Sequence, residues 1–132
     1  MMSKNNLALG QKFSVLIVDD DKIIRRIHKM LLTKFEFESH AVENGKEAVD
    51  LYISGKNFDL ILMDMEMAVM DGPKATRELR SMGINNVIVG VTSRGSTSEK
   101  QAFTEAGLDY CVEKPLSSET ITSLLKELAK KY

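Results

Sequence analysis

The chain has 132 residues, of which 43% are hydrophobic and 28% charged, and its formal net charge is −1. This length suits a single globular domain with its own hydrophobic core, and the near-zero charge excludes a broad basic face for nucleic acid or anionic membrane. A single cysteine, Cys111, excludes an intramolecular disulfide, and no apolar run approaches the roughly 18 residues of a membrane span. We therefore expect a soluble intracellular protein that binds neither nucleic acid nor membrane.

The chain alternates between two kinds of segment after a polar stretch at residues 1–12, which predicts a flexible leader before a domain at residues 13–132. Apolar runs rich in β-forming residues predict strands at Phe13–Val18, Phe37–Val42, Leu60–Met63, Val87–Val91 and Tyr110–Val112. Helical spacing of apolar residues predicts helices around Ile23, Ile24, Ile27, Met30 and Leu31, at Lys46–Ile53, Pro73–Met82 and Thr97–Ala106, and around Ile121, Leu124, Leu125 and Leu128.

The order of these segments, βαβαβαβαβα, favours an α/β fold with a parallel sheet covered by helices on both faces. The runs "VLIV", "LILM" and "VIVGV" do not alternate in polarity. Such continuous apolar runs are typical of strands buried on both sides.

Polar side chains follow four of the predicted strands, and this placement indicates a functional cleft. The residues are Asp19, Asp20 and Asp21 after the first strand, Asp64 after the third, Thr92 and Ser93 after the fourth, and Lys114 after the fifth. The carboxyl ends of parallel strands meet at one edge of the sheet, where ligands bind. We therefore expect these side chains to converge.

Such a cleft suits phosphoryl transfer. Clustered carboxylates are typical ligands of Mg²⁺, and a metal, a lysine and a hydroxyl together can surround the oxygens of a transferring phosphoryl group. A central carboxylate can then act as nucleophile and form an acyl phosphate.

Each residue also has a simpler interpretation. Asp20 or Asp21 could cap the helix that follows, Asp64 could be a turn acid, Thr92 a β-branched strand end, and Lys114 a solvated charge. The coincidence of all of them at strand ends is what favours the cleft.

Four motifs carry a resemblance to a known family. The stretches "VLIVDDD", "DLILMDMEMAVMDG", "VGVTS" and "EKPL" together resemble the receiver domain of two-component response regulators, from about Phe13 to Lys130. The resemblance implies a flavodoxin-like (CheY-like) doubly wound fold, with a five-stranded parallel sheet of order 2-1-3-4-5.

The resemblance also implies roles for individual residues. Asp64 would be the phosphoacceptor. Asp19 and Asp20 would be the acidic pair, with Asp20 the more direct Mg²⁺ ligand, and Glu66 would bind the metal through its backbone carbonyl. The hydroxyl of Thr92 would bind a phosphoryl oxygen, and Lys114 would pair with the phosphoryl group. The Lys114–Pro115 bond is expected to be cis. The donor in this family is a phosphohistidine on a histidine kinase or a histidine-containing phosphotransfer protein.

The stretches "VGVTS" and "CVEKPL", together with the bare receiver length, resemble stand-alone plant response regulators, particularly the short type C group, with type A as the nearest alternative. This implies a role in a cytokinin-type phosphorelay. The chain would act either as a phosphate sink or phosphatase toward the phosphotransfer protein, or as a signalling switch without DNA-binding output. A phosphorylation-independent interaction module is a further alternative. We expect a monomer in the cytoplasm, with the nucleus as a second possible compartment.

Two positions depart from the usual receiver pattern. Ala68 stands where many receivers have proline, and Cys111 stands where many carry a switch aromatic. Tyr110 is one residue early and is expected to face the other side of its strand. We expect Cys111 to be a small buried core residue, and we expect no catalytic role for His28 or His40.

A rival interpretation starts from "LIVDDDKI", which loosely fits the DxDx(T/V) motif of haloacid-dehalogenase-type phosphatases. Asp19 would then be the nucleophile and Asp21 the general acid. No acidic pair follows Lys114 closely to complete that metal site, and the chain has no room for a cap domain. The two interpretations differ in which aspartate becomes phosphorylated.

Overall fold

A computed structural model describes residues 13–93 and 96–131 of the chain, and the predicted leader at residues 1–12 lies outside this range. Within it, five strands form one parallel sheet of order β2-β1-β3-β4-β5, which confirms the predicted fold class. The strands are β1 (Ser14–Val18), β2 (Glu38–Val42), β3 (Leu60–Asp64), β4 (Val87–Thr92) and β5 (Tyr110–Glu113). The helices are α2 (Lys22–Lys34), α3 (Gly45–Ile53), α4 (Gly72–Ser81), α5 (Thr97–Glu105) and α6 (Ser118–Lys131).

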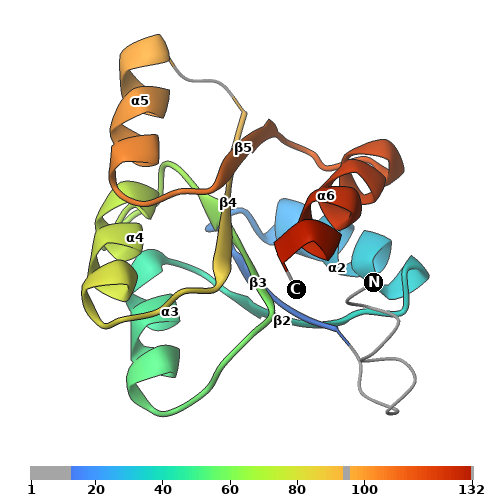
Figure 1. Cartoon of the computed structure of the whole chain (residues 1–132), viewed down its shortest axis with the longest axis horizontal. Helices are drawn as coiled ribbons and strands as arrows, with labels where there is room; N and C mark the ends of the chain where they lie inside the picture. The colour runs from blue at the N-terminus through green and yellow to red at the C-terminus, as the bar shows by residue number, and fades with distance from the viewer. Residues whose placement is uncertain (1–12, 94–95, 132) are drawn as a thin grey trace.

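The helices cover the sheet on both sides (Figure 1). Helices α2 and α6 lie on one side, and α3, α4 and α5 lie on the other. This is the expected result of right-handed crossovers, because the chain moves in one direction along the sheet from β1 to β2 and in the opposite direction from β2 to β5. None of the described helices combines the length and the apolar character needed to cross a membrane.

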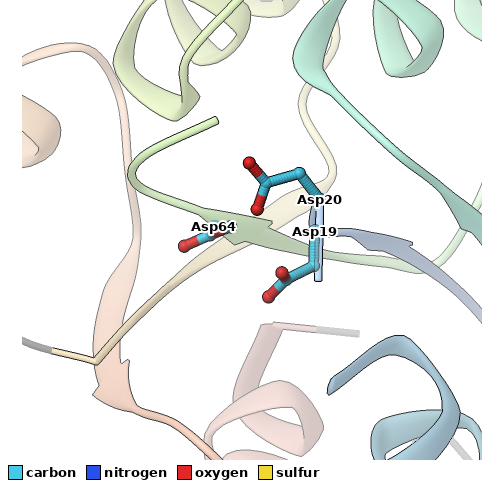
Figure 2. Close-up of side chains that lie close together, drawn as sticks. All are labelled: Asp19, Asp20 and Asp64. Carbon is cyan, nitrogen blue, oxygen red and sulfur yellow. The ribbon is translucent and has the colours of Figure 1, made fainter. Parts of the chain in front are cut away.

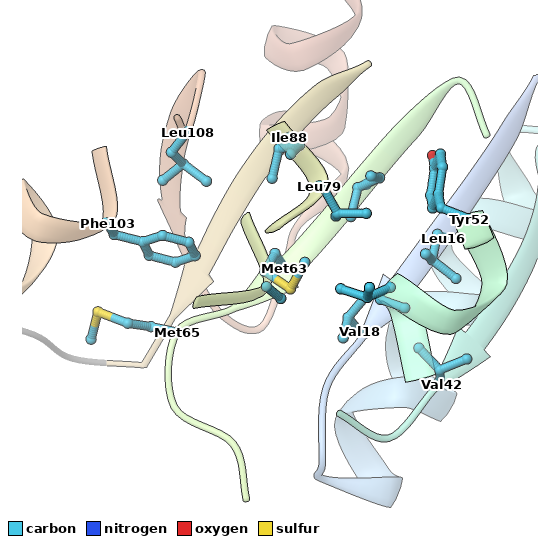
Figure 3. Close-up of a cluster of buried hydrophobic side chains, with 14 residues drawn as sticks. Leu16, Val18, Val42, Tyr52, Met63, Met65, Leu79, Ile88, Phe103 and Leu108 are labelled. Carbon is cyan, nitrogen blue, oxygen red and sulfur yellow. The ribbon is translucent and has the colours of Figure 1, made fainter. Parts of the chain in front are cut away.

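Two hydrophobic layers hold the helices to the sheet, because successive strand residues point to opposite faces. The layer under α2 and α6 is built from strand residues such as Ile17 and Leu62, with Leu32 and Leu124 from the helices. The layer under α3, α4 and α5 is shown in Figure 3 and contains Leu16, Val18, Val42, Tyr52, Met63, Met65, Leu79, Ile88, Phe103 and Leu108. Both faces of β3 and β4 are therefore buried, as their continuous apolar runs predicted.

Helix α2 is present as predicted, but of its apolar stripe Leu31 packs against the core while most of the others are exposed. Ile23, Ile27 and Met30 are 69%, 40% and 61% exposed. The buried residues of α2 are His28 and Leu32. The helix therefore presents an apolar outer surface and carries an imidazole on its inner face, an arrangement that hydrophobic periodicity alone did not predict.

Two glycines allow close packing around the end of β3. Gly72, the first residue of α4, donates its N–H to the Met65 carbonyl at 3.0 Å. A Cβ atom at Gly72 would collide with the backbone carbonyl of Asp64 and approach the Phe103 ring to 2.8 Å. A Cβ atom at Gly90, in the middle of β4, would approach Leu108 and the same Phe103 ring to 2.5 and 2.8 Å.

These contacts predict that Gly72→Ala and Gly90→Ala each lower the free energy of unfolding by about 1–3 kcal/mol, because each overpacks the same core region. Chemical denaturation followed by circular dichroism measures this loss. The two variants are matched in their contact with Phe103, but only Gly72→Ala touches the backbone of Asp64. The Asp64 amide resonance should therefore shift more in Gly72→Ala than in Gly90→Ala, and equal shifts in the two variants would contradict this packing.

Candidate functional site

Three aspartates meet at the carboxyl edge of the sheet (Figure 2). Asp19 directly follows β1, and Asp64 is the last residue of the neighbouring strand β3. Their side chains are buried, whereas Asp20 is exposed. One carboxylate oxygen from each of the three residues lies within 4.8 Å of the others. The predicted convergence of Asp19, Asp20 and Asp64 is therefore observed.

Lys114 brings a positive charge to this cluster. It follows β5, and its Nζ atom lies 3.0 Å from Asp19 Oδ2 and 3.2 Å from Asp64 Oδ1. The backbone N–H of Lys114 donates to the Thr92 carbonyl at 3.0 Å. The Lys114–Pro115 peptide bond is cis, as the resemblance predicted.

The loop between β1 and α2 is held by its own hydrogen bonds. Asp21 caps α2 by accepting from the N–H groups of Ile23 and Ile24, and its N–H donates to Asp19 Oδ1 at 2.9 Å. Arg25 Nη1 donates to the Asp19 carbonyl at 2.8 Å. The role of Arg25 was not predicted, since an arginine in the first turns of a helix looks the same in a sequence whether it is solvated or bonded.

A cleft opens over these residues. It is lined by Asp20, Asp21, Ile24, Asp64, Glu66, Thr92, Ser93, Lys114 and Pro115. Thr92 is the last residue of β4 and is 2% exposed. The side chain of Glu66 is exposed at the rim. All the residues that the sequence predicted for the site are thus at or beside one cleft.

Burial and charge shift the ionisation of the two central groups. Burial, and then the negative charge of Asp19, raise the pKa of Asp64 from its ordinary value to about 6, although Lys114 opposes this. Burial alone would lower the pKa of Lys114, but its hydrogen bond to Asp19 and the charge of Asp64 produce a net rise. Lys114 is therefore a stable cation, and Asp64 becomes fully ionised only above neutral pH or with further compensation.

The residues present fit a hard divalent cation. Three carboxylates face one ammonium, so that two negative charges remain uncompensated when all are ionised. The ligands are all oxygen atoms, which Mg²⁺ and Ca²⁺ prefer over nitrogen or sulfur. The incomplete charge balance is the observation that supports a cation at this point.

The prediction for Cys111 is wrong, because its side chain is exposed. It lies on β5, an edge strand of the sheet, and lines a cavity together with Thr92, Lys100 and Thr120. Tyr110 is half-buried, and its hydroxyl donates to Glu127 Oε1 of α6 at 3.3 Å. In the register of β4 and β5, Thr92 pairs with Glu113, and Cys111 pairs with Gly90 two positions earlier.

Comparisons with known proteins agree with this geometry. The sequence model of the family described as "Response regulator receiver domain" matches residues 15–126. "Two-component response regulator 24" of Arabidopsis thaliana is 49% identical over 123 residues, which are 93% of this chain and 88% of the relative. "Two-component response regulator ORR42" of Oryza sativa subsp. japonica is 41% identical and covers 92% of this chain and 91% of its own length.

A solved structure adds a similar fold in a complex. It contains the receiver domain of the response regulator Ssk1 of Saccharomyces cerevisiae with the histidine phosphotransfer protein Ypd1. The match has a TM-score of 0.75 and 26% sequence identity and covers 89% of this chain and 87% of the other.

The raised pKa of Asp64 predicts that Asp64→Asn stabilises the protein in the absence of divalent cations. Ionised Asp64 is unfavourable in the folded state, so the wild type loses stability as pH rises from about 4 through about 6. Above this window the variant should be more stable by about 3 kcal/mol at most. The measurement is denaturant unfolding in EDTA between pH 4 and pH 8.

The control for this experiment is Glu38→Gln, the same chemical change at an exposed position of β2. It should not gain stability in this pH window. Added Mg²⁺ should reduce the difference between the wild type and Asp64→Asn at pH 8. A constant difference from pH 4 to pH 8 would contradict the assigned cause.

Proposed function

The chain belongs to the response regulator receiver family, and on that premise we propose that it accepts a phosphoryl group from a phosphohistidine onto Asp64. The donor that we propose is a histidine-containing phosphotransfer protein or a histidine kinase. The reaction would be one step of a multistep phosphorelay of the cytokinin type, in the cytoplasm or nucleus, with this chain acting as a monomer formed by residues 13–132.

The observation that carries this proposal is the position of the Asp64 carboxylate. It stands at the end of a strand that is buried over its whole length, and Oδ1 is 3.2 Å from Lys114 Nζ. The strand fixes the nucleophile, the cleft opens over it, and the lysine is already at hydrogen-bonding distance. Catalysis of phosphoryl transfer depends mostly on such positioning and charge compensation.

The proposed reaction exchanges one bond to phosphorus for another. An oxygen of ionised Asp64 attacks the phosphorus atom, the bond between phosphorus and the donor imidazole nitrogen breaks, and that nitrogen keeps the electron pair. Lys114 would stabilise the added charge on the phosphoryl oxygens, and the hydroxyl of Thr92 would donate to one of them. The product is an acyl phosphate on Asp64.

We propose that Asp19, Asp20 and Asp64 hold Mg²⁺ through their carboxylates and that Glu66 contributes its backbone carbonyl. Bound there, the ion would neutralise negative charge on the phosphoryl oxygens. The supporting observation is the pair of uncompensated negative charges in the cluster. Asp21 contributes to the site in another way, because its carboxylate caps α2.

We further propose that the chain returns the phosphoryl group to water and so drains the phosphotransfer protein. In that step a water oxygen attacks phosphorus, the bond to Asp64 breaks, and the carboxylate is regenerated as inorganic phosphate leaves. Cys111, which is exposed and lines a cavity together with Thr92, offers no aromatic ring there, and this favours the sink over a switch that reports its state.

The phosphatase alternative with Asp19 as nucleophile is less well supported. Both Asp19 oxygens are engaged, Oδ2 by Lys114 and Oδ1 by the Asp21 N–H, whereas the contact of Lys114 with Asp64 involves Oδ1 alone. The general acid of that mechanism, Asp21, is engaged as a helix cap. To act as nucleophile and general acid, Asp19 and Asp21 would therefore have to break these hydrogen bonds.

The donor is proposed to dock over the exposed apolar surface of α2, formed by Ile23, Ile27 and Met30. This surface begins beside the cleft, since Ile24 of the same helix lines it. An exposed apolar stripe of this kind is typical of a surface that is covered by a partner helix.

Transfer from a phosphotransfer protein radiolabelled on its histidine tests the acceptor. The wild type and Mg²⁺ should remove label from the donor, and Asp64→Asn should remove none, because the nucleophile is absent. Rapid appearance of free phosphate would support the sink, and label that persists on the wild type would support a switch. Equal transfer to Asp64→Asn would reject Asp64 as acceptor and make Asp19→Asn the next variant to examine.

Ile27→Glu tests the docking surface. A charge in the proposed interface should slow transfer from the phosphotransfer protein by about tenfold or more. Transfer from acetyl phosphate, which requires no docking surface, should lose far less. Ile53→Glu is the matched control, since Ile53 is 67% exposed on α3, a helix on the opposite side of the sheet. A similar loss in Ile53→Glu would exclude a specific surface on α2.

A further inference from the structure

His28 is an unusual residue for the place that it occupies. It lies in the middle of α2, is 1% exposed, and shares the inner face of the helix with Leu32. A leucine would satisfy the packing there at no electrostatic cost, whereas a buried imidazole must have a hydrogen-bond partner. The partner therefore identifies what the imidazole contributes.

That partner is a backbone group on the far side of the site. The N–H of Leu116 donates to His28 Nε2 at 3.0 Å in a fully buried hydrogen bond between residues 88 positions apart. Since Nε2 accepts, the hydrogen bond assigns the neutral ring, with its proton on Nδ1. Burial also lowers the pKa of His28, with Lys114 adding to this effect and Asp19 opposing it.

Leu116 closes the segment that carries the active-site lysine. The segment begins at Lys114, whose N–H donates to the Thr92 carbonyl, and Pro115 has no N–H to donate. The N–H of Leu116 is therefore the first backbone donor after Lys114. The segment is anchored to β4 at its start and to His28 at its end.

The helix that carries His28 is tied to the acids. Its N-terminus is capped by Asp21, and Arg25 Nη1 donates to the Asp19 carbonyl at 2.8 Å. His28 thus connects the helix that follows Asp19 and Asp20 to the segment that carries Lys114. Displacement of either side would change the distances of 3.0 and 3.2 Å between Lys114 Nζ and the two carboxylates.

We propose that His28 is a positioning residue that fixes the Lys114–Leu116 segment against α2 and so keeps the lysine ammonium between Asp19 and Asp64. It contacts neither the cleft nor the reacting atoms. Its effect on phosphoryl transfer rests on the function proposed above, but its effect on the placement of Lys114 does not.

Two substitutions separate the hydrogen bond from the packing. His28→Leu fills the core but leaves the buried N–H of Leu116 without its acceptor, so the segment is expected to shift. His28→Gln places an amide oxygen near the former position of Nε2 and can still accept. If the hydrogen bond to Leu116 positions the segment, His28→Gln should keep the placement of Lys114 that His28→Leu loses.

The test is a double-mutant cycle of His28→Leu with Lys114→Ala, with His28→Gln alongside. With Lys114 present, His28→Leu should slow phosphoryl transfer by about tenfold, as expected for a displaced catalytic group. His28→Gln should stay within about threefold of the wild type, and His28→Leu should change the residual rate of Lys114→Ala by less than about twofold. An equal loss from His28→Leu in both backgrounds, or a His28→Gln as slow as His28→Leu, would overturn the proposal.

Calorimetric titration with Mg²⁺ alone gives a second readout that requires no phosphoryl transfer. An ammonium held at the two carboxylates repels a cation, so His28→Leu should bind Mg²⁺ about two- to fivefold more tightly than the wild type. In the Lys114→Ala background, His28→Leu should not change the affinity for Mg²⁺ any further. General loosening of the fold would weaken binding instead, and weaker or unchanged binding would overturn the proposal.

The two readouts distinguish the two proposals. A wild type that binds Mg²⁺ but accepts no phosphoryl group contradicts the proposed function, and the calorimetric cycle then decides the role of His28 by itself.

Discussion

The ammonium of Lys114 lies between two buried carboxylates, and the arrangement of the rest of the site depends on this contact. Asp19 and Asp64 are neighbours because β1 and β3 are adjacent, and their charges repel where little water screens them. The compensating lysine comes from β5, so it has to reach across β4. Without it, burial and repulsion would favour a protonated Asp64, and a protonated carboxyl group is a poor nucleophile.

The fold and most of the site could be predicted from the sequence, because both follow from features that a sequence displays directly. Apolar runs without alternation imply strands covered on both faces, and parallel strands bring their carboxyl ends to one edge. The strand order was therefore enough to predict that Asp64, Thr92 and Lys114 lie at one edge of the sheet. The contact of Lys114 with Asp19, which is as close as its contact with Asp64, could not be predicted, since the distance between two loops depends on how each loop is anchored.

The features that were missed depend on contacts between distant segments. The isoleucines of α2 form a regular stripe, but which face of a helix is buried depends on its neighbours as well as on its own pattern. Here the rotation of α2 agrees with the Asp21 cap and with the hydrogen bond from Leu116 to His28, 88 positions away. The exposure of Cys111 was missed for a similar reason. Alternation along an edge strand does not reveal whether a helix covers each face.

The two residues at the start of β5 bear on how a change at Thr92 could be transmitted. Tyr110 is held toward α6 by its hydrogen bond to Glu127, so its ring is not available to follow a movement of Thr92. Thr92 pairs with Glu113 on β5, and Cys111, which pairs with Gly90, lines the same cavity as Thr92 with a small side chain that has few atoms with which to transmit a displacement. Neither side chain therefore provides a free aromatic ring beside Thr92. This arrangement is why we propose a phosphate sink rather than a switch that reports its state.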